Sequence, residues 1–550
     1  MDNLFEELKK IIKGDVSNDE TVLAEYSHDA SLFEIKPQVV VFPKDENDVR
    51  ALVKFVNKHK EGNPRLSITG RSAGTDMSGG AINESIIIAF GKYFNKDPKI
   101  IGNIATVQPG VLYRDFELRT LEKNLIFPSY PASKGLCAIG GIFNNNSGGE
   151  KSLQYGKTEK YIRRVEVVLS DGNTYELKKL NKEELEKKMA QKNFEGEIYR
   201  KMHKLINDNY KTIMDAKPNV SKNSAGYSLW NVYDKENKTF DLTQLWAGAQ
   251  GTLGLMLEGD LELVETKKHS AMLIIYLRSM THLGKIIDEV LPLKPESFES
   301  YDDNTLKLAL KYFPEFARQL GPVGMIQAGL AFMPAFLSLF TGKRLPSLVL
   351  QVEFASNDPD EVKTKLNTLR EKLKSLRKVT QIAEEEEQKK YWLVRRESFN
   401  LLRKKIRNKH TAPFIDDFVI SPYDIADVIP KITDILRKHP KFIFTVAGHV
   451  GDGNFHIIPL VDIKNPKVRT AIPEISDQVY KVVAKHKGSI TGEHNDGLIR
   501  TPYLEEMYGE KIIKLFEETK EIFDPQNIFN PRKKVNGDLK YAMDHLRTSW

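Results

Sequence analysis

The sequence predicts a fold that mixes helices and strands, α+β or α/β, divided into two or three domains. With 550 residues, the chain is too long for one compact hydrophobic core. Short apolar runs closed by turn residues alternate with stretches of helical periodicity, so strands and helices are expected to mix along the chain. Hydrophobic residues make up 40% of the chain and charged residues 29%, which indicates a globular rather than a disordered protein.

The alternation is clearest in the first 265 residues. Residues 37–43, PQVVVFP, form an apolar run closed by proline, which predicts a buried strand. Asp45 is placed to cap the helix that follows, because valine and leucine then recur at helical spacing. Residues 65–70 and 84–90 predict two further strands, and Asp171-Gly172 predicts the turn of a β-hairpin.

A second region begins near Lys267. Residues 270–280 and 347–356 are apolar runs that predict strands, whereas residues 360–378 and 473–487 have the periodicity of helices. This alternation suits an antiparallel sheet covered by helices.

Composition and the N-terminus narrow the class of protein. The net charge of +7 is small for this length, so nucleic-acid binding is not indicated. Cys137 is the single cysteine, which excludes an intramolecular disulfide, a Cys₄ zinc site and an iron–sulfur cluster carried by this chain alone. Residues 1–14 predict an amphipathic helix and lack the apolar core of a secretory signal, so we expect a cytoplasmic location.

Residues 321–342 form an uncharged segment that approaches the length of a membrane span, which is about 20 residues. Pro322, Pro334 and four glycines lower its helix propensity. Three interpretations stay open: a buried core hairpin, a transmembrane span, and a patch that docks on a membrane or a partner.

Three glycine-rich loops occur in the first half of the chain, at residues 67–81, 128–161 and 245–263. Glycines let backbone N–H groups approach phosphate oxygens, and the serine, threonine and asparagine residues add donors. Gly156-Lys157-Thr158 matches the ending of a nucleotide-triphosphate loop, but Lys151 stands where that motif needs its first glycine, and a G-x-G-x-x-G pattern is absent. The first loop alone is equally well explained as a surface loop, but together the three suggest a large ligand with a diphosphate.

Two motifs in the second half place histidines beside acidic residues and glycines. They are AGHVGDGNFHIIPL at residues 447–460 and ITGEHNDG at residues 490–497. His449 follows an apolar strand and His456 lies on the next one, so both imidazoles are expected at one end of a sheet, with Glu493 as a third ligand. Spacing alone leaves open whether these residues form a metal site or two ordinary turns.

The glycine loops resemble the flavin-binding domain of the vanillyl-alcohol-oxidase-type flavoproteins, also called PCMH-type FAD-linked oxidases. Residues 37–55 resemble the opening strand and helix of that domain, and residues 70–80 its pyrophosphate loop. Residues 131–149 and 248–258 resemble the loops around the isoalloxazine and the ribityl chain.

The later motifs narrow the resemblance to the D-2-hydroxy-acid dehydrogenase branch, which holds D-lactate, glycolate and D-2-hydroxyglutarate dehydrogenases. Residues 448–456, 492–497 and 523–533 carry this similarity, and the resemblance as a whole covers residues 39–534.

That branch implies a particular domain order. Residues 1–265 would form a PCMH-type FAD-binding domain of two α+β subdomains. Residues 266–490 would form an α+β, ferredoxin-like substrate-capping domain with 321–342 as an apolar insertion. Residues 491–550 would return to the FAD domain.

The resemblance also implies which residues contact FAD. A histidine often present in the pyrophosphate loop of covalent relatives is absent here, so noncovalent FAD is expected. The implied FAD contacts are Arg71, Ser72, Ala73, Gly74, Thr75, Asp76, Ser78, Gly79, Pro131, Gly135, Gly140, Gly141, Asn145, Ser147, Gly148, Ser152, Tyr155, Gly156, Gly251, Thr252, Gly254, Leu255 and Asn530.

For the chemistry, the resemblance implies a divalent ion on His449, His456 and Glu493, for which Zn, Mn, Fe and Co are all suitable. His494 is the expected general base, with a pKa near the working pH, and Asn454 is expected to position the substrate or a ligand.

The substrate carboxylate is assigned to Arg396, which matches the arginine of that branch, although a basic helix surface also explains it. Relatives that use dicarboxylates usually offer another basic residue near 413–422, where Asp416 and Asp417 stand here. These charges would repel a second carboxylate and so favour D-lactate.

The function expected from the sequence is therefore oxidation of a D-2-hydroxy acid, D-lactate above others, by hydride transfer to FAD. The electrons would pass to a separate acceptor such as a quinone, a cytochrome or an electron-transfer flavoprotein. Contact with the inner face of a membrane stays open. The alternatives are a D-2-hydroxyglutarate dehydrogenase and a noncatalytic flavoprotein that relays electrons.

Overall fold

The computed structural model of the chain describes residues 4–311, 346–374, 379–383, 387–389, 391–392, 395 and 409–548. Two predictions, the apolar insertion 321–342 and Arg396, lie outside these residues. Within the described ranges, no helix combines the length and apolar character that crossing a membrane requires.

The first sheet of the N-terminal half is mostly parallel and follows the predicted pattern. Its order among the described residues is β1-β2-β4-β3, with β2, β4 and β3 parallel and β1 antiparallel to β2. Asp45 caps the following helix as expected, since its side chain accepts the N–H groups of Asn47 and Asp48. The strands of this sheet are β1 (Asp15–Ser17), β2 (Val39–Phe42), β3 (Ile68–Arg71) and β4 (Ile86–Ala89).

A larger antiparallel sheet follows, in the order β10-β11-β9-β8-β12-β6-β5. The predicted hairpin is its β8–β9 pair, and Gly172 in the turn has φ 74°. The strands are β5 (Lys99–Ile101), β6 (Ile104–Val107), β8 (Ile162–Val168), β9 (Thr174–Leu180), β10 (Tyr233–Asp234), β11 (Thr239–Asp241) and β12 (Leu255–Glu262), and β7 (Leu125–Ile126) pairs with β13 (Val264–Glu265).

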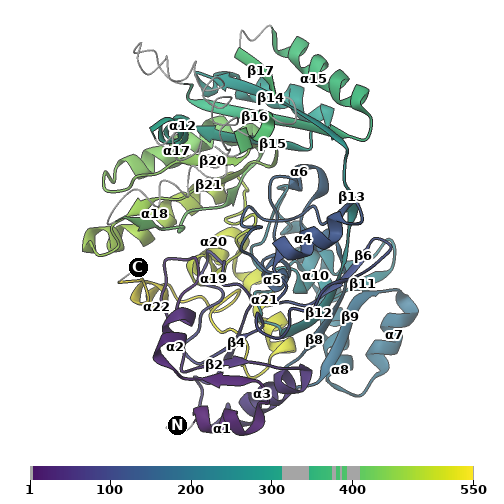
Figure 1. Cartoon of the computed structure of the whole chain (residues 1–550). Helices are drawn as coiled ribbons and strands as arrows, with labels where there is room; N and C mark the ends of the chain where they lie inside the picture. Colours follow the sequence, from purple (N-terminus) through teal and green to yellow (C-terminus); the bar gives the residue numbers. More distant parts are fainter. Residues whose placement is uncertain are drawn as a thin grey trace.

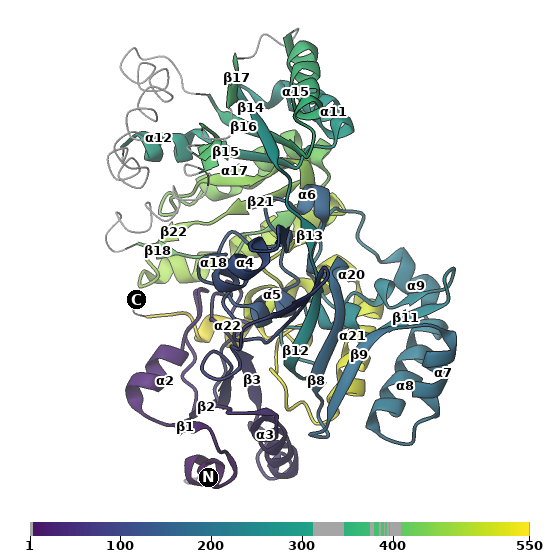
Figure 2. The same ribbon diagram turned by 45° about the vertical axis from the view of Figure 1, so that its right-hand side comes forward.

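Helices surround these two sheets (Figures 1 and 2). They are α1 (Leu4–Ile11), α2 (Glu20–Tyr26), α3 (Glu46–His59), α4 (Tyr113–Leu121), α5 (Ile139–Asn145), α6 (Ser152–Tyr155), α7 (Lys182–Ala190), α8 (Phe194–Asp208), α9 (Tyr210–Asp215) and α10 (Thr243–Trp246).

The second half is built on an antiparallel sheet, here called the cap sheet, which forms the upper part of the molecule in Figure 1. Its order over the described residues is β17-β14-β16-β15-β20-β21-β19. The strands are β14 (His269–Leu277), β15 (Ser297–Asp302), β16 (Leu348–Ser356), β17 (Val379–Ala383), β19 (Phe418–Val419), β20 (Val446–His449) and β21 (Asn454–Ile457), and β18 (His410–Thr411) pairs with β22 (Leu460–Val461).

The helices of this half are α11 (Leu283–Val290), α12 (Asp303–Lys311), α15 (Pro359–Leu373), α17 (Ile425–Arg437) and α18 (Pro466–Lys485). The start predicted for the last of these, at Pro473, is wrong. The helix begins at Pro466, and Asn465 caps it by accepting the N–H of Lys467, so Pro473 lies inside the helix. Proline is favoured at the first position of a helix, and both Pro466 and Pro473 could be that position. The sequence pattern alone did not distinguish them.

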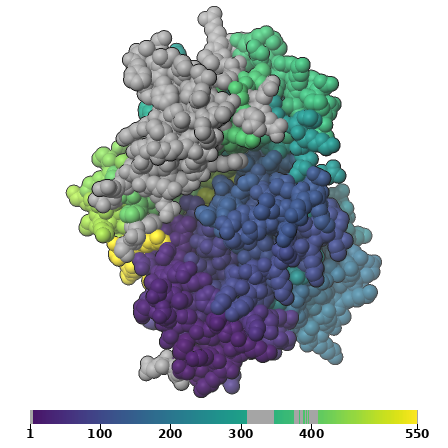
Figure 3. Space-filling model, in the orientation of Figure 1, coloured from purple at the N-terminus to yellow at the C-terminus, as the bar shows by residue number. Residues whose placement is uncertain are grey.

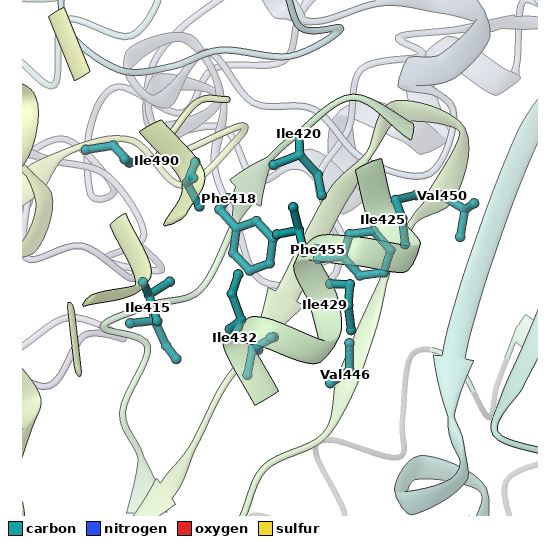
Figure 4. Close-up of a cluster of buried hydrophobic side chains, with 14 of the residues drawn as sticks. Ile415, Phe418, Ile420, Ile425, Ile429, Ile432, Val446, Val450, Phe455 and Ile490 are labelled. Atoms are coloured by element: carbon teal, nitrogen blue, oxygen red, sulfur yellow. The ribbon is translucent and has the colours of Figure 1, made fainter. Parts of the chain in front are cut away.

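The two faces of the cap sheet differ in chemistry. On one face, residues such as Leu350, Phe455 and Val446 join the buried side chains of α15, α17 and α18 in one apolar core. Figure 4 shows part of this core, where Phe418 and Phe455 stack with ring centroids 6.3 Å apart. The opposite face carries polar residues and, as shown below, the histidines.

The C-terminal segment packs against the N-terminal half, and in Figure 1 it lies between that half and the cap. Phe516 is fully buried and meets Tyr227 and Tyr508 edge-on, with ring centroids 5.8 and 5.4 Å apart. A space-filling view shows the purple and blue N-terminal residues forming the lower part of one face (Figure 3). The helices of this segment are α19 (Gly497–Arg500), α20 (Leu504–Tyr508), α21 (Glu510–Phe523) and α22 (Leu539–Asp544).

We expect Phe516→Ala to destabilise the protein by about 3–5 kcal/mol, because it leaves a cavity among aromatic rings. Urea unfolding followed by fluorescence measures this as a lower midpoint. The control is Lys514→Ala on the same helix, because the side chain of Lys514 is 64% exposed and pairs with Glu510 at the surface. Equal midpoints for the two variants would show that α21 does not stabilise the fold through this contact.

Candidate active site

The first glycine loop is held in shape by Asp76. Its carboxylate accepts hydrogen bonds from the backbone N–H groups of Ser78 (3.0 Å) and Gly80 (2.7 Å) and from Nδ2 of Asn145 (3.0 Å). Gly79 has φ 84°, a backbone conformation that favours glycine. Because Asn145 ends α5, this contact joins the first loop to the second.

Asn530 joins the first loop to the third. Its carboxamide accepts from Oγ1 of Thr69 (2.8 Å) and donates to the backbone oxygens of Gly80 (2.8 Å) and Gln250 (2.6 Å). The sequence predicts that Asn530 contacts FAD, but these bonds use its amide to hold the loops together. The three glycine-rich loops therefore do meet in one place.

A cavity of about 810 Å³ opens beside the first loop. Ser72, Ala73 and Ala138 line it together with Gly110, Val111, the loop at residues 95–98 and exposed residues of α4 such as Leu118 and Arg119. Its volume lies within the range of pockets for cofactors, about 300–1,000 Å³. Gly110 and Val111, which the sequence did not mark, lie three and four residues after the end of β6.

The glycines of α5 show how closely the loops approach. A Cβ on Gly140 would lie 2.4 Å from Oγ of Ser72, so only glycine fits there. A Cβ on Gly135 or Gly141 would meet nothing within 4 Å, so these backbones border open space. The residues present thus fit a large extended ligand such as FAD.

The remaining residues predicted to contact FAD lie on the same loops or at their ends. Several have their hydroxyls engaged by the protein: Oγ1 of Thr252 lies 2.7 Å from the hydroxyl of Tyr227, and Oγ of Ser152 accepts the N–H of Gly149 at 2.8 Å. The set comprises Gly74, Thr75, Pro131, Ser147, Gly148, Ser152, Tyr155, Gly156, Gly251, Thr252, Gly254 and Leu255.

Arg71, a predicted FAD contact, is held by the protein, and the thiol of Cys137 is not activated as a nucleophile. Nη1 of Arg71 donates to the backbone oxygen of His28 at 2.7 Å, and its guanidinium lies over the ring of Tyr26. Cys137 is buried, and burial raises the pKa of its thiol to about 12. A thiol with so high a pKa is a poor nucleophile, and noncovalent binding of FAD stays a prediction.

His449, His456 and Glu493 come together at one end of the cap sheet. Each offers one ligand atom, and the three atoms lie within 4.8 Å of one another. Strand register puts both imidazoles on the polar face, with ring centroids 5.2 Å apart. Oε1 of Glu493, from the loop after α18, lies 3.6 Å from Nε2 of His449.

Carboxylates stand behind both histidines. Nδ1 of His449 lies 2.6 Å from Oε1 of Glu299, and Nδ1 of His456 lies 3.1 Å from Oδ1 of Asp416. Such partners orient a ring and leave Nε2 for an ion. Burial and the ammonium of Lys222 lower the pKa of His449 well below its usual value, so its ring is neutral, as metal binding requires. The residues present therefore fit a divalent metal ion.

His494 differs from its predicted state. Burial opposes protonation, but the carboxylates of Asp416 and Asp417 outweigh it and raise the pKa of His494 to about 9. Nδ1 of His494 lies 2.5 Å from Oδ2 of Asp416. Among the residues present, His494 is therefore protonated at neutral pH, whereas the sequence predicts a pKa near the working pH.

Asp417 positions the loop that carries these groups. Its Oδ2 accepts the backbone N–H groups of Glu493 (2.8 Å) and His494 (2.7 Å), and its Oδ1 accepts Nδ2 of Asn454 (3.0 Å). Oδ1 of the buried Asn454 has no partner among the described residues. Asn454 thus keeps one polar atom for a ligand, and its role in positioning the substrate or a ligand stays a prediction.

Lys222 is a part of the site that the sequence analysis missed. Its side chain is 1% exposed, and Nζ lies 2.6 Å from Oε1 of Glu493 and 3.1 Å from Oδ2 of Asp452. Although burial opposes the ionisation of Glu493, this ammonium and the neighbouring histidines together outweigh it and lower the pKa of Glu493 to about 2. Lys222 lies in SKNSAGY at residues 221–227, where nothing in the local pattern marks it as a charged core residue.

Arg395, next to the predicted Arg396, is described and lies beside the histidines. Nη2 of Arg395 is 3.2 Å from Oε2 of Glu299, and its side chain is 13% exposed. Glu299 therefore contacts both Arg395 and His449. No local pattern marks Glu299 as a residue of the site, because a single acidic residue in a strand is usually exposed.

Comparison with known proteins identifies the two halves. A model of the FAD binding domain matches residues 37–178, and a model of the C-terminal domain of FAD linked oxidases matches residues 266–534. The chain belongs to the FAD-linked oxidase family. The resemblance proposed from the sequence is thereby confirmed at the level of the family.

Individual relatives are distant. Over 533 residues the chain is 25% identical to a D-2-hydroxyglutarate dehydrogenase of Pseudomonas putida, a match that covers 95% of this chain and 50% of that protein. This FAD-linked oxidase thus spans about half the length of that relative. Over 537 residues it is 25% identical to a D-lactate dehydrogenase of Anaerostipes hadrus, covering 96% of this chain and 94% of that one.

A solved structure supports the fold. The 4-ethylphenol oxidase from Gulosibacter chungangensis superposes with a TM-score of 0.69 at 16% identity, covering 98% of each chain. With the family matches, this likeness confirms the predicted PCMH-type α+β fold.

Metal binding by the histidine cluster is testable by zinc titration of metal-stripped protein in a calorimeter. We expect His449→Ala and Glu493→Gln to weaken zinc binding more than 100-fold, and Glu299→Gln to weaken it about 10–100-fold through the ring of His449. His439→Ala, in the same half but outside the cluster, is the control. Unchanged affinity in the Glu493 variant would contradict the assigned ligand set.

Replacing Lys222 by methionine leaves Glu493 as a buried charge without its cation, which costs about 3–5 kcal/mol when no ion is present. We expect Lys222→Met to melt at a lower temperature without metal, and to gain more from added zinc than the wild type does. Lys520→Met is the matched control, since Lys520 is a buried lysine paired with Asp524 away from the cluster. Equal zinc responses in both variants would argue against the pairing.

Proposed function

We propose that this FAD-linked oxidase is an FAD- and metal-dependent dehydrogenase that oxidises a D-2-hydroxy acid to the 2-oxo acid. The observation that carries the proposal is the position of Glu493 between the two halves. It faces His449 on the cap sheet, while a Cβ on Gly148 of the second glycine loop would lie 3.2 Å from its Oε1. The candidate metal ligands therefore border the loops assigned to FAD.

Bound FAD would supply the acceptor for the hydride that leaves C2 of the substrate. A bound divalent ion would lower the pKa of the C2 hydroxyl. The protein's own part is to hold and move the proton. His494 is the proposed acceptor of the hydroxyl proton, and it must first lose the proton that Asp416 and Asp417 stabilise on it. A divalent ion on the neighbouring ligands would favour that loss, because its positive charge repels the positive charge of protonated His494.

Asp416 and Asp417 do not by themselves favour D-lactate over a substrate with two carboxylates. Both side chains are fully buried, and their oxygens contact the rings of His456 and His494 and backbone N–H groups. Their charges are therefore balanced inside the protein and do not by themselves exclude a second substrate carboxylate. The proposed class is D-2-hydroxy acids, with D-lactate and D-2-hydroxyglutarate both members.

The proposal includes a separate electron acceptor, of which a quinone, a cytochrome and an electron-transfer flavoprotein are the candidates. The chain has a single cysteine and so offers no cluster of thiolates for a second redox centre. A membrane contact through residues 321–342 stays a prediction.

An anaerobic absorbance titration tests the proposal. We expect D-2-hydroxy acids to bleach the flavin of the purified protein, the L-isomers to leave it yellow, and a chelator to abolish the bleaching until metal is restored. His494→Gln is expected to slow flavin reduction by about 10²–10⁴-fold, because a positioned general base contributes that much. Tyr423→Phe, an exposed change on the cap, is the control.

A yellow protein that no hydroxy acid bleaches would contradict the proposal and favour an electron-relay flavoprotein. Bleaching at the wild-type rate in the His494 variant would remove that residue from the mechanism.

A further inference from the structure

Residues 28–35, here called the buttress loop, connect α2 to β2 and pack on the first glycine loop. Nη1 of Arg71 donates to the backbone oxygen of His28 at 2.7 Å. From the other side, the backbone N–H of Ala30 donates to the backbone oxygen of Asp76 at 2.9 Å. Two hydrogen bonds in opposite directions therefore join the two loops.

Asp29 and Phe33 complete this interface. Oδ2 of Asp29 accepts the backbone N–H of Ala81, at the end of the first glycine loop, at 3.4 Å. A Cβ on Gly79 would lie 2.8 Å from a ring carbon of Phe33, so the loops approach too closely for a larger residue. The buttress loop thus supports the same part of the first glycine loop that Asp76 holds in shape.

The buttress loop is buried although it forms neither a helix nor a strand of a sheet. Ser31, Leu32 and Phe33 are 0% exposed. Oδ1 of Asp29 accepts both the backbone N–H and the hydroxyl of Ser31, at 3.0 and 2.5 Å, which satisfies donors within the loop. A buried irregular segment also needs donors for its backbone oxygens, and here they come from a distant part of the chain.

Arg547 supplies these donors. Its backbone N–H donates to the oxygen of Leu32 at 3.0 Å, and its guanidinium donates to the backbone oxygens of Phe33 (Nε, 3.1 Å) and Asp29 (Nη2, 2.5 Å). Arg547 is only 7% exposed and lies 514 residues from Phe33 in the chain. A guanidinium carries five N–H donors in one plane, so a single side chain can hold two separate oxygens in a fixed relation.

The segment around Arg547 is itself fixed on two sides. The backbone N–H of Glu34, in the buttress loop, donates to the oxygen of His545 at 2.9 Å. On the other side, Nη1 of Arg469, on α18 of the cap, donates to the backbone oxygen of Arg547 at 3.3 Å. The segment therefore joins the cap to the buttress loop and, through it, to the first glycine loop.

We propose that Arg547 is a positioning residue for FAD. By holding the buttress loop, it keeps the first glycine loop in the shape that retains the cofactor. Apparent affinity falls with the fraction of molecules that have the binding-competent shape, so loosening the buttress loop weakens FAD binding. The inference rests on FAD binding by this loop and does not depend on which substrate is oxidised.

The test is the rate at which the FAD-loaded protein releases its cofactor. The holoprotein is diluted into buffer without FAD, and the rising fluorescence of free flavin is followed. We expect Arg547→Leu to release FAD at least 10-fold faster than the wild type, because two buried backbone oxygens lose their donors. Arg547→Lys keeps the charge but not the planar set of donors, so its release rate should be intermediate.

Ser31→Ala loosens the same loop from within and leaves the guanidinium in place. The hydroxyl of Ser31 donates to Asp29 and accepts the backbone N–H of Phe33 at 3.2 Å. We expect this smaller change to speed FAD release at least three-fold. It also decides the question if Arg547→Leu does not fold.

Two controls separate positioning from general stability. Arg200→Leu removes an arginine that also donates to two backbone oxygens, those of Met189 and Gln191, beside α7 and α8 and across the N-terminal half from α2 (Figures 1 and 2). Ile432→Ala destabilises the cap by removing a fully buried side chain of α17. Both should release FAD at the wild-type rate, at a temperature where circular dichroism shows every variant folded.

A folded Arg547→Leu protein that keeps FAD as long as the wild type would overturn the inference. Where that variant does not fold, wild-type retention by Arg547→Lys and Ser31→Ala would overturn it equally. Release from Ile432→Ala as fast as from the Arg547 variants would also do so, because FAD loss would then follow stability. Faster release confined to the Arg547 and Ser31 variants would support it.

Discussion

The buried carboxylate of Asp417 is the interaction on which the candidate site depends. It precedes β19 at the edge of the cap sheet and accepts the backbone N–H groups of Glu493 and His494, at 2.8 and 2.7 Å. A carboxylate that accepts several N–H groups stays ionised even when buried, and the histidines and Arg500 lower its pKa further against the cost of burial. The loop that carries Glu493 and His494 is thereby fixed to the cap.

Pairs of opposite charge support the cluster and link the two halves. Lys222, from the N-terminal half, pairs with Glu493, and Arg395 of the cap pairs with Glu299, which also contacts the neutral ring of His449. Ionised groups are costly to bury unless each has a partner, so these pairs depend on one another. Removing one partner leaves the other as an isolated charge, which is why the geometry holds only when both halves are folded together.

The two faces of the cap sheet have different roles: one packs into the apolar core, and the other carries the residues of the candidate site. One face contributes Phe455 and its neighbours to an apolar core under α17 and α18, whereas the other presents His449, Glu299 and Gln351 in one register row. Period-two alternation in a strand makes this division possible, because adjacent residues point to opposite sides. A shift of one residue in register would bury the histidines in the apolar core and expose Phe455 to the site.

Local features could be predicted from the amino-acid sequence: the capped helix after β2, the β8–β9 hairpin, the three glycine loops, and the pair of motifs with His449, His456 and Glu493. Each of these features depends on residues only a few positions apart in the chain. The family resemblance then indicated how the motifs belong together in one fold. Only the tertiary structure decided the partners. Lys222 and Glu493 are 271 residues apart in the chain, and His449 and Glu299 are 150 apart. The elevated pKa of His494 and the balanced charges of Asp416 and Asp417 likewise follow from burial and contacts between distant segments, which no local pattern records.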